Sequence, residues 1–216
     1  SSAASDVYKR QLAAAFATLP REEVRVISTA APHVCRESVQ YVEDVLDVTQ
    51  GKLGMGFSCG SDDMPALLMG NTLFGGSSNS KLFLNVREKL SLCYYASSLY
   101  HRQKGLITVS SGIEFQNYQR AYDEIMAQLE AVQKGELEDW ELEGARSTLL
   151  NSYATVGDSQ GKLENFYLGQ AATGQHETPA DLARAIQDMT AERICRAMST
   201  VKLDTVYFLK GKEAEA

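Results

Sequence analysis

Histidines are the first residues to weigh in a search for hydrolytic chemistry. A zinc hydrolase needs several His, Cys or carboxylate ligands, often with two histidines one helical turn apart and a glutamate nearby. The chain has three histidines, which lie in unrelated segments at His33, His101 and His176. None of them belongs to an HxxEH or HExxH motif. The residues therefore predict no metal site and no catalytic residue in this chain in isolation.

A second candidate for chemistry is the pair Arg87 and Tyr94, which are seven residues apart. The spacing of Leu82 and Val86 predicts a helix over 80–90 with part of its surface in the core. Arg87 falls off the most apolar side of that helix, and Tyr94 begins the following strand. An arginine fork can grip a carboxylate or a peptide carbonyl, and a tyrosine hydroxyl can add a hydrogen bond. Periodicity alone favours a solvated Arg87 and a packed Tyr94.

The run Gly75-Gly76-Ser77-Ser78-Asn79-Ser80-Lys81 superficially suggests a phosphate-binding loop. It does not have the GxxxxGK[ST] spacing, and it joins two predicted helices instead of a strand and a helix. A tight turn between helices is the better interpretation.

Composition sets the broad class. The chain has 216 residues, 44% hydrophobic and 23% charged, which fits one domain with a sizeable core. A formal net charge of −7 argues against nucleic acid as a partner, and no apolar run is long enough to predict a membrane span. The four cysteines are far apart without CxxC spacing, which is typical of buried, reduced thiols in an intracellular protein.

The first eleven residues, 1–11, can be back-translated codon for codon to a transposase-based sequencing adapter. We therefore expect them to be an artefact and not natural protein. On that interpretation the natural sequence is cut at Leu12, the domain covers 12–211, and 212–216 is a tail. The expected location is the cytoplasm, and on this interpretation the natural N-terminus lies upstream of residue 12.

The strands are predicted from period-two alternation. In 53–59, Leu53, Met55, Phe57 and Cys59 share one face, and the other face carries Lys52 and two glycines. Two interpretations of the glycine face stay open, namely tight packing by a neighbouring element or a groove for an extended peptide. The remaining predicted strands are 41–48, the hairpin 94–101 and 106–113, the closing strand 205–209, and a short β-type stretch within 22–29, which is followed by a loop over 30–38.

Helices are predicted from their caps and from helical spacing. Asp63 and Pro65 open a helix to about residue 74, and Gly135 ends an amphipathic helix that starts near Tyr118. Further helices are expected over 12–16, around Leu163, Phe166 and Tyr167, after the capping box Thr178–Asp181, and after Thr190. A helix is also expected over 138–156, with its inner side formed by Trp140, Ala145, Leu149 and Tyr153. Strands and helices come in blocks, which predicts an α+β fold with layered helices on a mostly antiparallel sheet.

Several phrases of this sequence resemble the C-terminal domain of the M16 (pitrilysin/insulinase-type) peptidase family. They are Leu73-Phe74-Gly75-Gly76-Ser77-Ser78-Asn79-Ser80-Lys81-Leu82-Phe83, then Val86-Arg87-Glu88-Lys89, then Tyr94. Met189-Thr190-Ala191-Glu192-Arg193-Ile194 and Gly135-Glu136-Leu137-Glu138-Asp139-Trp140-Glu141-Leu142 are similar to two later segments of that domain. The resemblance spans about Leu12 to Lys210.

The resemblance implies an M16/LuxS-like metallohydrolase domain that works as half of a pair closing around an unfolded peptide. One half carries zinc through an HxxEH motif. The other half supplies an arginine and a tyrosine seven residues apart, and Arg87 and Tyr94 match that pair. In the family the arginine is thought to contact substrate carbonyls, and the tyrosine to steady the oxyanion. The implied cofactor is thus zinc in a partner half, and the implied partners are that half and a peptide or small protein substrate.

The phrases Val48-Thr49-Gln50-Gly51-Lys52-Leu53 and Ser91-Leu92-Cys93-Tyr94-Tyr95-Ala96-Ser97-Ser98 look most like one bacterial branch of the family. That branch pairs a zinc-less subunit with a zinc-bearing one, and some members are named for modification of elongation factor P. By comparison, the first strand of the domain is missing here. The leading expectation is a substrate-binding, non-catalytic subunit. The alternatives are the C-terminal part of a single-chain zinc peptidase whose HxxEH lies upstream, and a non-proteolytic M16-fold scaffold.

Overall fold

The computed structural model describes residues 2–20 and 36–212, with side chains from residue 5 onward. Its strands are β1 (Gln40–Leu46), β2 (Gly51–Cys59), β3 (Cys93–His101), β4 (Leu106–Ile113) and β5 (Val201–Gly211). Its α-helices are α1 (Ser2–Ala17), α2 (Met64–Asn71), α3 (Tyr118–Lys134), α4 (Asp139–Ala154), α5 (Gln160–Thr173), α6 (Pro179–Gln187) and α7 (Ala191–Met198). Two π-helical segments, η1 (Thr72–Gly76) and η2 (Leu82–Lys89), and two 3-10 turns, η3 (Phe115–Asn117) and η4 (Val156–Asp158), complete the described chain.

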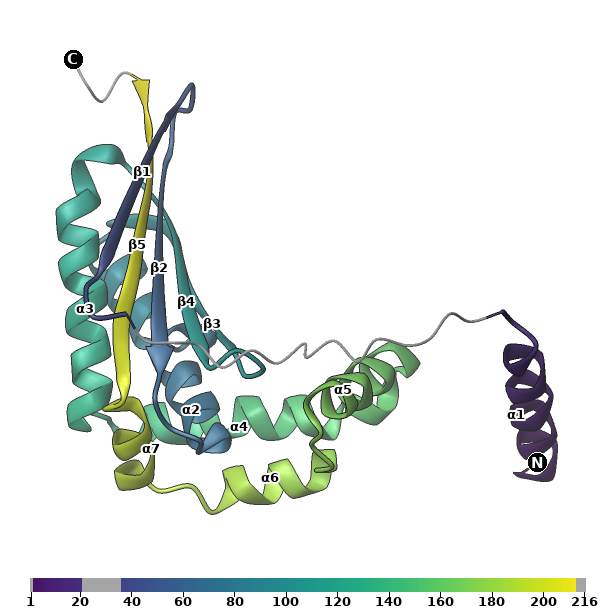
Figure 1. The fold of residues 1–216 in the computed structure, drawn as a ribbon. Coiled ribbons are helices and arrows are strands. Elements are labelled where there is room, and N and C mark those ends of the chain that lie inside the picture. The colour runs from purple at the N-terminus through teal and green to yellow at the C-terminus, as the bar shows by residue number, and fades with distance from the viewer. Residues whose placement is uncertain (1, 21–35, 213–216) are drawn as a thin grey trace.

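The strands form one sheet in the order β1-β5-β2-β4-β3. The pairs β2–β4, β2–β5 and β3–β4 are antiparallel, and only β1 and β5 run parallel among the described strands. Figure 1 shows α3 lying along one side of the sheet, with α4, α5 and α6 gathered at the end where β5 begins. The predicted α+β fold, with layered helices on a mostly antiparallel sheet, is confirmed.

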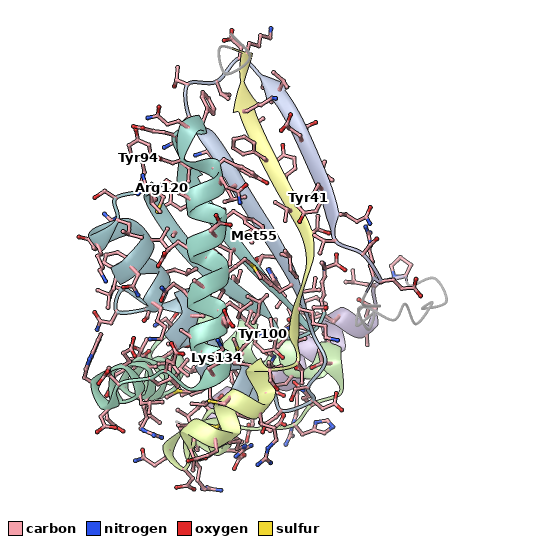
Figure 2. The ribbon with its side chains drawn as sticks, turned by 90° about the vertical axis from the view of Figure 1, so that its left-hand side faces the viewer. Tyr41, Met55, Tyr94, Tyr100, Arg120 and Lys134 are labelled. Atoms are coloured by element: carbon pink, nitrogen blue, oxygen red, sulfur yellow. The ribbon has the colours of Figure 1, made fainter. Side chains whose placement is uncertain are left out.

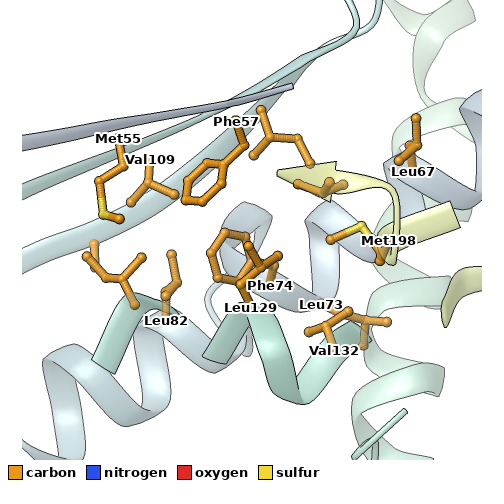
Figure 3. Close-up of a cluster of buried hydrophobic side chains, with 14 of the residues drawn as sticks. Met55, Phe57, Leu67, Leu73, Phe74, Leu82, Val109, Leu129, Val132 and Met198 are labelled. Carbon is orange, nitrogen blue, oxygen red and sulfur yellow. The ribbon is translucent and has the colours of Figure 1, made fainter. Parts of the chain in front are cut away.

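The core lies between one face of this sheet and the helices. The alternation predicted for β2 is correct as far as Phe57, because Leu53, Met55 and Phe57 are each at most 2% exposed. It fails at the end of the strand, where Ser58 is buried and Cys59 is of intermediate exposure, after a register shift between Gly56 and Phe57. Phe57 meets Phe74 of η1 edge to face, with ring centroids 6.3 Å apart, and Figure 3 shows the two rings pointing toward each other. Full burial of one such side chain stabilises the fold by about 1.5–3 kcal/mol.

Both edges of β2 are paired within the sheet, and the glycines of its other face are half-buried. A Cβ on Gly54 would lie 3.8 Å from Tyr207, and one on Gly56 would lie 3.9 Å from Thr205. These are ordinary contacts with the adjacent strand β5. Since β4 and β5 occupy the two edges of β2, an extended peptide has no free edge to pair with there. The distances at Gly54 and Gly56 show no tight packing against the glycine face, so both interpretations of that face stay predictions.

Several predicted boundaries of helices are confirmed by their caps. Asp63 accepts the N–H of Ala66 at the start of α2, and Thr178 and Asp181 form the predicted capping box of α6. Gly135 takes a left-handed φ of 77° directly after α3. Thr190 caps α7 by accepting the N–H of Arg193. Glycine suits the left-handed position because it has no Cβ to clash with the preceding carbonyl.

The prediction that Trp140 lies on the inner side of the fourth helix is wrong. Trp140 is 54% exposed, whereas its neighbour Glu141 is 7% exposed. Glu141 is turned inward because its carboxylate pairs with the buried Lys81 and also caps α4. Ala145 and Leu149, predicted on the same side, are buried as expected.

The predicted helical segment 12–16 lies within α1, which continues back through residues 2–11 without a break. The expected boundary at residue 12 stays a prediction. The β-type stretch in 22–29 and most of the loop 30–38 lie outside the described residues.

Three of the four cysteines are described, and Cys59, Cys93 and Cys195 are free thiols of intermediate exposure. They are less deeply buried than predicted, and their reduced state stays a prediction. Burial raises the pKa of Cys59 to about 12, so this thiol stays neutral at physiological pH. Among the described helices, none combines the length and the apolar character that a membrane span needs.

Candidate functional site

The glycine-rich run forms a tight turn between η1 and η2, as predicted. The backbone N–H of Ser80 donates to the carbonyl of Ser77 at 3.2 Å. Gly75 lies against β3, because an added Cβ there would be 2.8 Å from the backbone nitrogen of Ser98 and 2.7 Å from Leu82. A side chain at this position would therefore push the turn away from the strand. The turn fixes where η2 begins.

A buried ion pair holds the other side of this turn. The ammonium of Lys81 lies 2.9 Å and 3.0 Å from the two carboxylate oxygens of Glu141, which follows 60 residues later. Glu141 also accepts the backbone N–H of Glu138 at 2.9 Å, which completes a capping box at the start of α4. Sequence reasoning missed this anchor. The one sequence feature that points to a role for Glu141 is the Glu138-x-x-Glu141 spacing, which is a variant of the capping-box pattern.

The segment η2 carries Arg87. Leu82 and Val86 of η2 are fully buried, as their spacing predicts. The guanidinium of Arg87 lies over the ring of Phe83, with its carbon 4.7 Å from the ring centroid, and its Nε is 3.6 Å from Glu88. The side chains of Arg87 and Glu88 are 41% and 53% exposed, so this ion pair is a weak one. The guanidinium therefore stacks on the ring of Phe83, and its N–H groups stay available to a ligand.

Tyr94 lies at the start of β3 and is 59% exposed. The interpretation as a packed tyrosine, which periodicity favoured, is therefore wrong, since more than half of this residue is open to solvent in the described structure. Figure 2 shows Tyr94 and Tyr100 at opposite ends of β3. Tyr94 and Arg87 both line one surface pocket of about 410 Å³, together with Cys93, Glu88, Glu114 and Asn117. The structure thus brings the predicted pair to one opening.

Cys93 is the nucleophilic side chain of this pocket. Burial raises its pKa, against the opposing effects of a hydrogen bond with Ser111 and of the charge on Arg87. A raised thiol pKa leaves little thiolate at neutral pH, and the thiolate is the nucleophile. The pocket therefore offers hydrogen-bond donors for binding and no activated nucleophile.

Arg87 also lines a second pocket of about 350 Å³ on its other side. The glycine-rich turn and the residues of β3 that follow Tyr94 form its walls. One arginine therefore separates two neighbouring hollows along the same strand.

The two described histidines, His101 and His176, belong to no metal-binding cluster. His101 is 3.0 Å from the hydroxyl of Thr108, His176 is exposed, and His33 lies outside the described residues. Within 2–20 and 36–212, no three His, Cys, Asp or Glu side chains come together as a metal site would need. The described residues do not fit a zinc ion.

Comparison with known proteins identifies the family. The model of the "Peptidase M16 inactive domain" matches residues 5–149. The chain belongs to the M16 peptidase family. An M16 relative from Bacillus subtilis (strain 168), named "Probable inactive metalloprotease YmfF", is 38% identical over 215 residues, covering 96% of this chain and 50% of the relative.

Solved structures agree with this assignment. A conserved protein from Enterococcus faecalis V583 superposes with a TM-score of 0.80 at 30% identity, covering 90% of this chain and 47% of that one. A peptidase M16 inactive domain from Pseudomonas fluorescens has the same fold, with a TM-score of 0.68 at 17% identity, covering 81% of this chain and 43% of that one. The chain spans about half the length of these M16 relatives. It is a non-catalytic M16 domain.

Proposed function

We propose that this M16 domain binds the peptide substrate of a metallopeptidase whose zinc lies in another half. Arg87 and Tyr94 carry the proposal, because Arg87 is half-buried, Tyr94 is exposed, and both line the same pocket without a strong competing partner in the described structure. A peptide that entered this pocket would meet a fork of guanidinium donors and a phenol hydroxyl side by side.

The two side chains suit the chemistry of peptide cleavage. When a peptide carbonyl is attacked, its oxygen becomes an anion, and preplaced donors stabilise that charge without reorganising. Tyr94 has a hydroxyl to donate to this oxygen, and Arg87 has donors in a fixed fork for neighbouring carbonyls. The described residues of this chain hold no cluster that fits a zinc ion, and in this proposal the zinc lies in the other half.

The partner in this proposal is therefore a zinc-bearing M16 half. Zinc bound there would act as the Lewis acid, while this chain orients the peptide. The same division of roles holds whether that half is a separate subunit or an upstream part of the same polypeptide. A scaffold that had lost substrate binding would have no use for an exposed arginine and tyrosine in one pocket.

The test uses the full-length protein assembled with its zinc-bearing half and fluorescein-labelled, unfolded casein. Turnover and peptide binding are measured for Arg87→Ala and for the wild type. We expect Arg87→Ala to cut turnover by roughly tenfold to a thousandfold, similar to the cost of removing one preplaced hydrogen-bond donor from an active site. Unchanged turnover would remove the site assignment, and a wild-type assembly that bound no casein would favour the scaffold.

A further inference from the structure

A pocket of about 440 Å³ lies between α5 and the tip of the β3–β4 hairpin, away from Arg87 and Tyr94. Figure 1 shows this tip reaching toward α5. The two walls are close, since a Cβ added to Gly169 of α5 would lie 3.7 Å from the side-chain nitrogen of Gln103. The volume is in the range of small-molecule sites in proteins. We call this hollow the α5 pocket, and its main side chains are Arg102, Gln103, Tyr153, Lys162, Asn165 and Phe166.

The α5 pocket is cationic, although the chain as a whole is acidic. Arg102 and Lys162 line it, and no Asp or Glu does. The whole sequence has 28 acidic and 21 basic residues, so a pocket that holds only cations runs against the overall composition. Asp158 and Glu164 lie close to Lys162 in the sequence, but neither of them lines the pocket. The lining therefore favours an anion and repels no part of it.

Neither cation is neutralised by a carboxylate of the described chain. Arg102 and Lys162 take part in none of the ion pairs formed within 2–20 and 36–212. The ammonium of Lys162 makes one long contact, 3.4 Å to the hydroxyl of Thr155. The guanidinium residue Arg102 is half-buried. Partial burial of a charge without a counter-charge is unfavourable, and an anion in the pocket would offset that cost.

Neutral hydrogen-bond donors lie beside the two cations. Burial raises the pKa of Tyr153, against the opposing effect of the charge on Arg102, so the phenol hydroxyl stays protonated and able to donate. Gln103 and Asn165 add side-chain amides to the lining. A guanidinium fork with further N–H and O–H donors is the set that binds the oxygens of a phosphate or a carboxylate.

The α5 pocket also has an apolar side. Val156 of η4 is 8% exposed, and Phe166 of α5 is half-buried. The ring of Phe166 meets that of Tyr167 edge to face, with centroids 5.3 Å apart. A bare inorganic ion would leave this side without a partner. An anion that carries a flat apolar group would cover it and gain the free energy of burying apolar surface.

We propose that the α5 pocket binds a small organic anion, in which a phosphate or a carboxylate is joined to a flat apolar group. The anionic end lies between Arg102 and Lys162, and the apolar group lies against Phe166 and Val156. A ligand bound in this way joins α5 to the tip of the β3–β4 hairpin. Tyr94 lies at the opposite end of β3, so this site is separate from the candidate peptide site (Figure 2).

The first experiment identifies the ligand chemistry with the unaltered full-length protein. Phenyl phosphate, phenylacetate and inorganic phosphate are titrated separately by calorimetry at about 0.15 M salt, where distant charges are screened. We expect one aromatic probe to bind with a Kd of about 1 mM or below, at least about fivefold tighter than inorganic phosphate. The tighter aromatic probe shows whether the anion is a phosphate or a carboxylate. Inorganic phosphate binding as tightly as both aromatic probes, or no binding of either aromatic probe, would overturn the proposal.

A second experiment locates the site. Arg102→Gln should raise the Kd of the tighter probe at least about tenfold, because it removes charged hydrogen bonds to the anion. Lys104→Gln is the matched control, since Lys104 is exposed on the same hairpin tip and does not line the α5 pocket. It removes the same charge and should leave the Kd near the wild-type value. Equal weakening by the two variants would show a diffuse attraction to the tip and contradict the site.

Lys162→Gln covers the case in which Arg102→Gln does not fold. Lys162 is exposed, so its replacement should leave the fold intact and raise the Kd about threefold to tenfold. A wild-type Kd in this variant would contradict the placement of the anion between the two cations. None of these measurements uses turnover, so they can succeed or fail independently of the test of Arg87.

Discussion

Lys81 and Glu141 form an ion pair in the interior, with the lysine nitrogen 2.9 Å and 3.0 Å from the two carboxylate oxygens and both side chains at most 10% exposed. Lys81 immediately precedes η2, and Glu141 lies in the first turn of α4. The pair therefore ties the segment that carries Arg87 to a helix far along the chain. It positions the candidate site without touching it.

Glu141→Gln should destabilise the domain by roughly 3–5 kcal/mol, because it leaves the ammonium of Lys81 buried without its counter-charge. Urea unfolding followed by circular dichroism measures the change. Glu143→Gln is the matched control, since Glu143 is 67% exposed in its ion pair with Arg146 and should change stability by less than about 0.5 kcal/mol. Equal losses in the two variants would contradict the assigned role of the buried pair.

Gly75→Ala should destabilise the domain by about 1–3 kcal/mol, since the new methyl group would meet the backbone of Ser98 and the side chain of Leu82. The clash involves backbone, which cannot rotate out of the way. Gly157→Ala is the control, because nothing lies within 4 Å of a Cβ there. Thermal unfolding compares the two variants, and a Gly75→Ala protein as stable as Gly157→Ala would argue against the close packing of the turn on β3.

Tyr94→Phe tests the hydroxyl alone. We expect turnover in the full assembly to fall roughly tenfold to a thousandfold, because a hydrogen-bond donor to the developing oxyanion is lost. Tyr207→Phe serves as the control, since it removes a tyrosine hydroxyl that bonds Asp44 at 3.0 Å outside the site. A decrease of the same size in both variants would point to a general structural effect and not to Tyr94.

Arg87→Lys keeps the charge and removes the fork. A point charge cannot engage two carbonyl oxygens in fixed geometry, so this variant should recover little of the activity lost in Arg87→Ala. Turnover of the two variants is compared at low and at moderate salt. Arg184→Lys, at an exposed arginine in the ion pair with Asp181, should behave as the wild type. Full activity of Arg87→Lys would show that only the charge matters.

We expect the free energy of unfolding of the domain to depend on the ionisation of Asp63 at acidic pH. The hydrogen bonds from Arg193 hold the pKa of Asp63 below its ordinary value, and the two residues form contacts of 2.7 Å and 2.9 Å. A depressed folded-state pKa means that ionised Asp63 contributes stability above the unfolded pKa of about 3.9, and that this contribution is lost as pH falls through the lower folded pKa. Asp63→Asn keeps the helix cap but should be less stable than the wild type at pH 7, with the gap closing below about pH 4. Urea midpoints against pH measure this, and Asp62→Asn, at an exposed neighbour, should show no such convergence.

Much of the fold could be predicted because local rules and tertiary packing agree. The alternation of Leu53, Met55 and Phe57 located β2 and its buried face, and Gly135 located the end of α3. The order of the strands could not be predicted from the sequence, since no local pattern shows that β5 pairs with both β1 and β2. Trp140 shows the limit of a pattern based on hydrophobicity, because the buried face of α4 runs through Glu141, Ala145 and Leu149 and so begins with a charged residue.

The candidate site could be predicted only in part. The spacing of Arg87 and Tyr94 drew attention to them through the family resemblance, while their periodicity pointed to a solvated arginine and a packed tyrosine. Their exposure at one pocket depends on the π-helical winding of η2 and on the turn against β3, and neither has a simple sequence pattern. Lys81 and Glu141 were missed for the same reason, since their partnership is purely tertiary.

The placement of β5 also affects how this domain is made. β5 lies inside the sheet between β1 and β2, although β2 ends at Cys59 and β5 begins only at Val201. While the ribosome is still adding the helices between them, β1 has no partner from the described strands and one edge of β2 is bare. The sheet therefore closes only after its last strand has emerged, and the nascent chain needs protection from aggregation until then.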